Sequence, residues 1–200
     1  MFLIGLIFHE SQKKNANANI TTLKELLFPD EIVDVDYSRL FFALKNKNID
    51  ALFAPNAWTL LNSIKLLFDQ WDSLFNDIEE EILTESDKFS KEIEENLMKQ
   101  ISPDQERANE LRAIFKSNTP KDVIKQIWPN LKKIICDTTA SYKIYVDQLM
   151  KNYLPDIDIE NSFLAINEAL IGKSIKSKGK FKLNLDFMNL FLLMMKAVFF

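Results

Sequence analysis

The most regular feature of the chain is a hydrophobic periodicity in its first half. Apolar residues occupy positions 58, 61, 64, 67, 68, 71, 74 and 75. This spacing of three and four residues puts the side chains on one face of an α-helix. We therefore predict a long helix over 57–75, begun by the Pro-Asn pair that precedes it, with Trp58 and Trp71 in the core. The short apolar run 51–54 fits either a strand or a tight turn.

Further helices are predicted on both sides of this one. Apolar residues also recur at helical spacing in 37–44, and the acid-rich segment 77–112 carries a single apolar stripe. Such a stripe is typical of surface helices that pack by one face. Ser102 as a cap and Pro103 at the first position predict another helix, and 121–128 reads as a short helix closed by the next proline. Residues 37–130 are thus expected to be mainly helical.

The pattern changes after this helical region. Residues 132–136 form a short run rich in Ile that predicts a buried strand. Thr138 and Thr139 can cap the helix that follows, and a second strand is predicted over 157–164. A strand, a helix and a strand in this order are typical of the βαβ unit of a parallel sheet. The predicted fold class is therefore α/β, with a partial parallel sheet and many helices.

Ligands of parallel sheets usually lie beyond the carboxyl ends of the strands. This places the candidate site at residues 137–141 and 165–168. The hydroxyls of Thr138, Thr139 and Ser141 are candidate pocket groups there, although helix capping explains threonines at these positions equally well.

The two ends of the chain are apolar. The opening MFLIGLIF has no positive leader, and we expect it to form a buried strand. Residues 187–200 are too short for a membrane span, and Lys196 interrupts them. The lysine-rich stretch 173–182 is expected to be a solvated loop, with contact to anionic lipid as the alternative. We expect 1–200 to be one partial domain: a lead over 1–36, the helical part, and a βαβ unit with an apolar tail over 131–200.

Composition excludes several classes of function. The net charge of -4 gives no general attraction to nucleic acid. Cys136 is the only cysteine and His9 the only histidine, so an internal disulfide or a Cys/His zinc site cannot form within the chain. A single cysteine fits a reducing compartment, which makes the cytoplasm the expected location. Cys136 ends a predicted strand and is expected to belong to the core.

Glycine is scarce, with Gly5, Gly172 and Gly179 as the only examples. A loop that cradles phosphate needs glycines, because only they let backbone amides approach the phosphate closely. No Walker loop or dinucleotide fingerprint is present in the sequence.

Four segments resemble one known family. They are DQWDSLFNDIEEEIL (69–83), ERANELRAIF (106–115), IWPNLKKIICDTTASYKIYVDQL (127–149) and NEALIG (167–172). In this order they resemble the auxin-responsive acyl-acid amido synthetases, the Gretchen Hagen family of adenylate-forming enzymes, and the resemblance extends over about 37–172. It implies the N-terminal domain fold of that superfamily. It also implies ATP-dependent activation of a carboxylic acid to an acyl-adenylate, followed by transfer of the acyl group to an amino acid.

Two segments that the resemblance marks as functional are altered here. The family has Thr-Thr-Gly-Ser-Tyr lining the acyl and nucleotide pocket, whereas residues 138–142 read Thr-Thr-Ala-Ser-Tyr, with Ala140 in place of the glycine. The family also has a tyrosine that packs on adenine, followed four residues later by a glutamate that helps to hold magnesium. Here Leu164 replaces the tyrosine and only Glu168 remains.

The resemblance therefore implies that Thr138, Thr139, Ser141 and Glu168 are the cofactor-binding residues, with Glu168 as the Mg²⁺ ligand. An ordinary carboxylate at a strand end is the alternative for Glu168. ATP and Mg²⁺ are expected only if the family activity is retained. With so few of the groups that adenylation needs, we expect a truncated, inactive relative of the family.

Two alternatives stay open. The chain is the active part of a longer acid-amino acid ligase, or it is a non-catalytic protein that contacts a partner or a membrane surface. Exposed sheet edges and the apolar tail are the surfaces through which we expect self-association or association with a partner.

Overall fold

The structure is a computed structural model that describes residues 35–84, 86–161, 163–166, 169–174 and 181–183. The strand predicted at the start of the chain, the lead over 1–34, most of the lysine-rich stretch and the tail 187–200 lie outside these residues.

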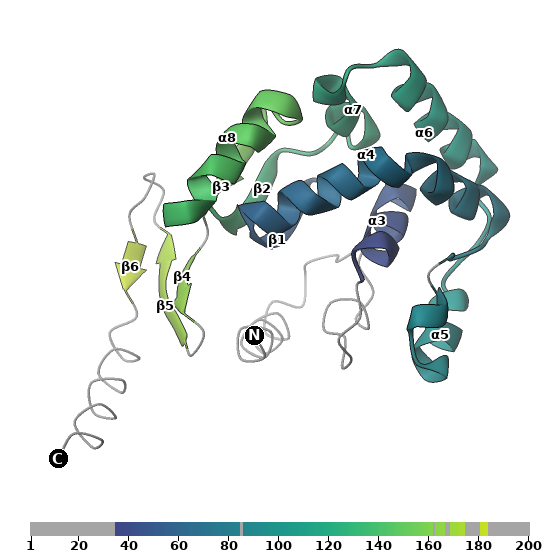
Figure 1. The fold of residues 1–200 in the computed structure, drawn as a ribbon, viewed down its shortest axis with the longest axis horizontal. Coiled ribbons are helices and arrows are strands. Elements are labelled where there is room, and N and C mark those ends of the chain that lie inside the picture. The colour runs from purple at the N-terminus through teal and green to yellow at the C-terminus, as the bar shows by residue number, and fades with distance from the viewer. Residues whose placement is uncertain (1–34, 85, 162, 167–168, 175–180, 184–200) are drawn as a thin grey trace.

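Helices dominate the first part of the described chain, as predicted. They are α3 (Asp36–Lys45), α4 (Ala57–Glu80), α5 (Lys91–Met98), α6 (Gln105–Ser117) and α7 (Pro120–Ile127), with a 3₁₀ turn η1 (Ser86–Lys88) before α5. Figure 1 shows α4 running through the middle of the molecule, with α3 on one side and α6 and α7 on the other. None of the helices in the described ranges is long and apolar enough to cross a membrane.

The core forms where the apolar stripe of α4 meets its neighbours. Leu67 and Phe75 of α4, Phe41 of α3 and Leu111 of α6 are almost fully buried there. A group of aromatic rings continues this core, and the ring of Phe115 lies 5.1 Å from that of Phe75, centroid to centroid. The predicted periodicity thus identified the central helix and its buried face, although α4 extends to Glu80.

The three tryptophans do not share one environment. Trp71 packs against the core, as predicted, and Trp128 is buried. The prediction for Trp58 was wrong, because its side chain is 49% exposed. Trp58 lies in the first turn of α4, and the apolar face of a helix is covered only where a neighbouring element reaches it.

The cap of α6 also differs from the prediction. Ser102 was expected to begin this helix, but the N-cap is Asp104, whose carboxylate accepts a hydrogen bond of 2.9 Å from the amide of Arg107. Both residue types cap helices well, so the local backbone decides which of them does so.

The predicted parallel sheet is present. It has three strands, β1 (Ala51–Asn56), β2 (Lys133–Asp137) and β3 (Asp158–Glu160), in the order β1-β2-β3. The pairs β1-β2 and β2-β3 are both parallel. Helix α8 (Lys143–Asn152) connects β2 to β3, which confirms the predicted βαβ unit, and the ambiguous segment 51–54 belongs to a strand.

The strand predicted over 157–164 is divided in two. Asp158–Glu160 forms β3 of the parallel sheet, whereas β4 (Phe163–Ile166) belongs to a separate antiparallel sheet with β5 (Ala169–Ser174) and β6 (Phe181–Leu183). Asn161 stands at the division, and its side-chain nitrogen lies 3.5 Å from a carboxylate oxygen of Asp137. The side chain of Asn161 thus points back toward the end of β2, at the place where the pairing between β3 and β2 has ended.

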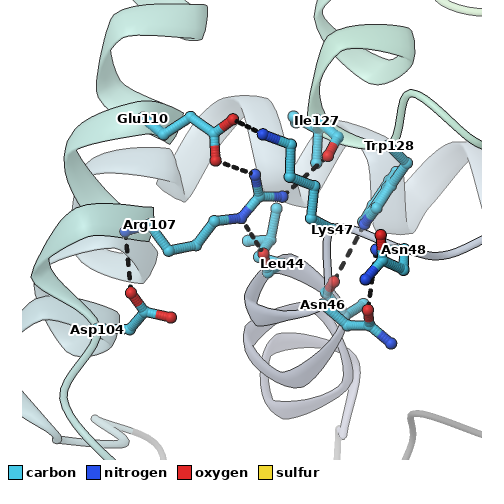
Figure 2. A network of polar contacts seen from close by, with 10 residues as sticks. Leu44, Asn46, Lys47, Asn48, Asp104, Arg107, Glu110, Ile127 and Trp128 are labelled. Carbon is cyan, nitrogen blue, oxygen red and sulfur yellow. Dashed lines mark hydrogen bonds and ion pairs between the residues drawn. The ribbon is translucent and has the colours of Figure 1, made fainter.

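A buried arginine joins three helices of the core (Figure 2). Arg107 of α6 donates from Nε to the carbonyl of Leu44 at 2.8 Å and from Nη2 to the carbonyl of Ile127 at 2.9 Å. Its Nη1 donates to Glu110 at 2.7 Å, and Glu110 also pairs with Lys47. The two carbonyls belong to the last turns of α3 and α7, where they have no partner within their own helix, so Arg107 satisfies both helix ends at once.

Candidate functional site

The carboxyl ends of the three parallel strands bring polar side chains to one edge of the sheet, which we call the carboxyl edge. Asn56 ends β1 and Asp137 ends β2, and the two residues are direct partners in the strand register. Asn161 follows β3. Helix α4 starts at this edge directly after β1, and α8 starts beyond a short loop after β2, with the two helices packed together (Figure 1).

Asp137 organises the loop that follows β2. One of its carboxylate oxygens, Oδ1, accepts a hydrogen bond of 2.8 Å from the backbone amide of Thr139 and one of 2.7 Å from the Thr139 hydroxyl. An aspartate that binds the chain two residues ahead in this way closes a tight turn. The turn leads through a 3₁₀ segment, η2 (Ala140–Tyr142), into α8.

The expected capping role of the threonines was therefore wrong. Thr139 donates its hydroxyl proton to Asp137 rather than accepting from the helix, and α8 begins after Tyr142 without a side-chain cap. The distance along the chain explains the difference, because η2 separates the threonines from the first residue of α8.

Asn56 accepts hydrogen bonds at the start of α4 in the same way as Asp137 does in the loop after β2. Its side-chain Oδ1 accepts from the backbone amide of Thr59 at 2.9 Å and from the Thr59 hydroxyl at 3.1 Å. The first bond is the usual N-cap contact, which satisfies one of the free amides of a helix start. At the ends of both β1 and β2, a side-chain oxygen thus accepts hydrogen bonds from the amide and the hydroxyl of a threonine two or three residues further along the chain.

Asn161 completes the group from the third strand. Its Nδ2 faces Asp137, at the long distance of 3.5 Å. Its Oδ1 is shielded from solvent and has no hydrogen-bond partner within the described part of the chain. Such an acceptor is unfavourable unless a donor reaches it.

The sequence predicted the position of the loop after β2, but not the residues of the other two strands that lie beside it. Thr138 and Thr139 are half-buried in the loop, and Ser141 is exposed. All three directly follow β2, at the predicted edge of the sheet. Glu168, predicted to hold Mg²⁺, lies outside the described residues. Asn56 and Asn161 were not predicted, and their positions at the ends of strands were the signal that could have identified them.

Cys136 precedes this loop and is not a candidate nucleophile. Its thiol is buried in the core, and burial together with the charge of Asp137 raises the pKa of Cys136 to about 11. A thiol with this pKa carries almost no thiolate near neutral pH, and the thiolate is the nucleophilic form. The prediction that Cys136 belongs to the core is confirmed.

Two backbone amides at the carboxyl edge are not free to bind a phosphate group. Phosphate at the start of a helix is held by free backbone amides, and the amides of Thr59 and Thr139 are already used. Lys143, the first residue of α8, is paired with Asp147 at 3.0 Å. Across the described ranges, no group of three or more His, Cys, Asp or Glu side chains is placed to hold a metal ion.

Comparisons with known proteins agree with this architecture. The GH3 family N-terminal domain matches residues 3–159. Among solved structures, the chain is similar to a "GH3.15 acyl acid amido synthetase", with a TM-score of 0.68 and 21% identity over 79% of this chain and 29% of that chain. It is also similar to "AtGH3.15 acyl acid amido synthetase in complex with 2,4-DB", with a TM-score of 0.59 and 24% identity over 69% of this chain and 24% of that chain.

These matches differ in what they show. No curated protein matches the chain. The structural matches have low identity and show the shared fold, and this chain spans less than a third of either solved protein. The family match covers most of the described residues and agrees with the segments in which the sequence resembles the same family. The chain therefore belongs to the GH3 family, through its N-terminal domain.

Proposed function

We propose that this chain is a truncated, catalytically inactive relative of the acyl-acid amido synthetases. In this proposal the carboxyl edge retains the place of the family's ligand site without the groups that adenylation needs. We also assign the chain to the cytoplasm, because a protein with one cysteine suits a reducing compartment.

The family reaction sets a clear chemical requirement. In adenylation, a carboxylate attacks the α-phosphate of ATP and pyrophosphate leaves. Negative charge on the phosphates has to be neutralised by positioned cations, backbone amides or Mg²⁺. The attacking carboxylate also has to be held in line with the leaving group.

The observation that carries the proposal is that both donors of Thr59 and both donors of Thr139 at the carboxyl edge already have acceptors within the chain. The amide and the hydroxyl of Thr139 both point to Asp137, and those of Thr59 both point to Asn56. Ala140 stands where the family has a glycine, so the loop also loses the freedom that lets a backbone approach phosphate. Thr138, Thr139 and Ser141 then remain as pocket groups without a role in phosphate transfer.

Pyrophosphate exchange tests this proposal. The full chain is incubated with ATP, Mg²⁺, radiolabelled pyrophosphate and a panel of aromatic and aliphatic acids, and label in ATP is counted. A GH3.15 acyl acid amido synthetase assayed in parallel is the positive control. Circular dichroism and tryptophan fluorescence establish that the chain is folded in the same buffer. We expect no label above the protein-free background, and acid-dependent label would refute the inactivity of the chain.

The second candidate is that the chain is the active part of a longer acid-amino acid ligase. The coverage favours it, because this chain matches only 29% of one solved acyl acid amido synthetase and 24% of another. Intact-mass measurement of the endogenous protein separates the two candidates. A mass close to 23.3 kDa supports the first candidate. A much larger product whose exchange activity depends on Glu168 supports the second.

A further inference from the structure

We propose that Thr84 is a phosphorylation site, and that a phosphate there releases the chain segment between α4 and α6 from the end of α4. This inference is independent of the proposed function, because it concerns the connection between two helices and not the carboxyl edge. It adds a covalent modification and the change in structure that follows from it.

The connection between α4 and α6 leaves the helical core and returns to it, and we call it the 81–103 segment. Glu81 ends α4 with a φ of 62°, in the left-handed region, and the amide of Asp104 donates to the carbonyl of Ile78 at 3.0 Å. Between these points lie η1 and α5, and Figure 1 shows α5 set apart from α3, α4 and α6. A segment that is joined to the core at its base can open locally while the core stays folded.

One carboxylate holds the first turn of the 81–103 segment. Asp77, in the last turn of α4, is 6% exposed. Its Oδ2 accepts from the amide of Thr84 at 2.8 Å and from the hydroxyl of Tyr37 at 2.9 Å, and its Oδ1 accepts from the hydroxyl of Thr84 at 2.7 Å. These donors are neutral, and no lysine or arginine among the described residues forms an ion pair with Asp77. The attachment therefore depends on the hydroxyl proton of Thr84 and is sensitive to added negative charge.

Thr84 lies where a protein kinase can reach it. The residue is exposed, and Asp87, three positions later in η1, is exposed as well. A carboxylate three positions after the hydroxyl suits acid-directed serine/threonine kinases, whose basic groups bind it. Ser86 and Ser90, the next hydroxyl side chains, have Phe and Ile at that distance. Because Asp77 binds the Thr84 hydroxyl in the closed form, the kinase acts on the locally open form.

Phosphorylation removes the attachment and puts repulsion in its place. The γ-phosphoryl group of ATP moves to Oγ1 of Thr84: the O–H bond breaks, a P–O bond forms, ADP leaves, and the proton goes to the base of the kinase. Oγ1 then has no proton to donate to Asp77, and the phosphate brings a charge of about −1.5 to −2 beside a buried carboxylate. Like charges repel strongly where water is scarce, so the first turn of the 81–103 segment separates from α4.

The site is tested with the full chain, a purified acid-directed serine/threonine kinase and Mg-ATP, and the product is mapped by peptide mass spectrometry. We expect phosphate at Thr84, and none at this position in Thr84→Val. Asp87→Asn should lower the initial rate of labelling at least about tenfold, whereas Ser86→Ala should change it less than about twofold. No phosphate at Thr84, or labelling that does not depend on Asp87, overturns the assignment of the site.

Amide hydrogen exchange tests the structural consequence. In the phosphorylated chain, amides in 82–90 should exchange at least about tenfold faster than in the unphosphorylated chain, while those of α6 stay unchanged. Unchanged or slower exchange over 82–90 overturns the inference, because the phosphate would then be accommodated without release.

Asp77→Asn separates charge repulsion from the bulk of the phosphate, because asparagine keeps the shape of the side chain and removes its charge. We expect phosphorylation to speed exchange in this variant less than about threefold. Circular dichroism and tryptophan fluorescence establish whether the variant is folded, and the comparison in the parent chain decides the inference if it is not. Equal acceleration in the folded variant and in the parent chain overturns the role of Asp77.

Discussion

Arg107 gives the sharpest prediction about what holds this fold together. Its side chain is 5% exposed, and its guanidinium bridges carbonyl groups in the last turns of α3 and α7 from its place on α6 (Figure 2). The substitution Arg107→Met keeps most of the side-chain length and apolar stem but removes all five donors. The carbonyls of Leu44 and Ile127 then remain buried without this partner.

The expected cost follows from these contacts. A buried polar group left without a partner costs about 1–3 kcal/mol, and two carbonyls lose Arg107. Loss of the contact to Glu110 adds little, because that carboxylate is 33% exposed and keeps its pairing with Lys47. We therefore expect Arg107→Met to lower the free energy of unfolding by about 2–5 kcal/mol. Arg107→Lys, which reaches fewer acceptors, should fall between this variant and the parent chain.

Urea unfolding followed by tryptophan fluorescence is the assay. Trp128 reports on the same region, since its indole nitrogen donates to the carbonyl of Ala43 at 3.1 Å. Arg112→Met is the matched control, because Arg112 lies on the same helix and pairs with Glu79, whose side chain is 30% exposed. We expect the control to cost less than about 1 kcal/mol. The reasoning is refuted if Arg107→Met is no more destabilising than Arg112→Met.

Three further predictions concern single polar groups. Asn56→Ala should lower the free energy of unfolding in urea by about 1 kcal/mol, because it removes the N-cap of α4. Asn56→Asp should retain most of this stability, and an equal loss in the two variants would count against the cap. Tyr37→Phe removes the hydrogen bond of 2.9 Å to the buried carboxylate of Asp77 and should cost about 1.5–3 kcal/mol, and a neutral effect would contradict this contact. Burial raises the pKa of the Cys136 thiol from 9.0 to about 11, so between these values the folded chain holds a proton that the unfolded chain has lost. Stability should therefore fall more steeply in the parent chain than in Cys136→Ala as pH rises through this window, and identical pH profiles would argue against the buried thiol.

Local pattern was sufficient for most of the helices. The spacing of apolar residues predicted the long central helix, and α7 begins at Pro120 within one residue of the predicted start. Strand β2 likewise differs from its predicted range by one residue at each end. These elements have a clear pattern of apolar residues or a residue such as Pro120 that marks their start, so the local sequence is enough to predict them.

Non-local pairing explains what the sequence did not predict in the sheet. Residues 157–164 were predicted as one strand, but their two halves belong to different sheets on either side of Asn161. The choice of partner depends on strands far away in the sequence, which periodicity does not report. The exposure of Trp58 has the same origin, because the pattern identifies a face and not what covers it.

The position of the loop after β2 was predicted, but its hydrogen bonds were not. The rule for parallel sheets predicts that a ligand lies near the loop of Thr138 and Thr139. The direction of the hydrogen bonds was not accessible, because a threonine can donate or accept and only the position of Asp137 decides between them. Arg107 shows the same limit, since nothing in its local sequence identifies the two distant carbonyls that it binds.

The most direct test of the account is amide hydrogen exchange at Thr139 and Thr59 in the chain without ligand. The central claim is that the carboxyl edge uses these donors internally, at 2.8 Å and 2.9 Å from their acceptors. We predict that the Thr139 amide exchanges at least about tenfold more slowly in the parent chain than in Asp137→Ala, and that Asn56→Ala has the same effect on Thr59. Free exchange of both amides in the parent chain would contradict the claim, because the edge would then have open donors for phosphate.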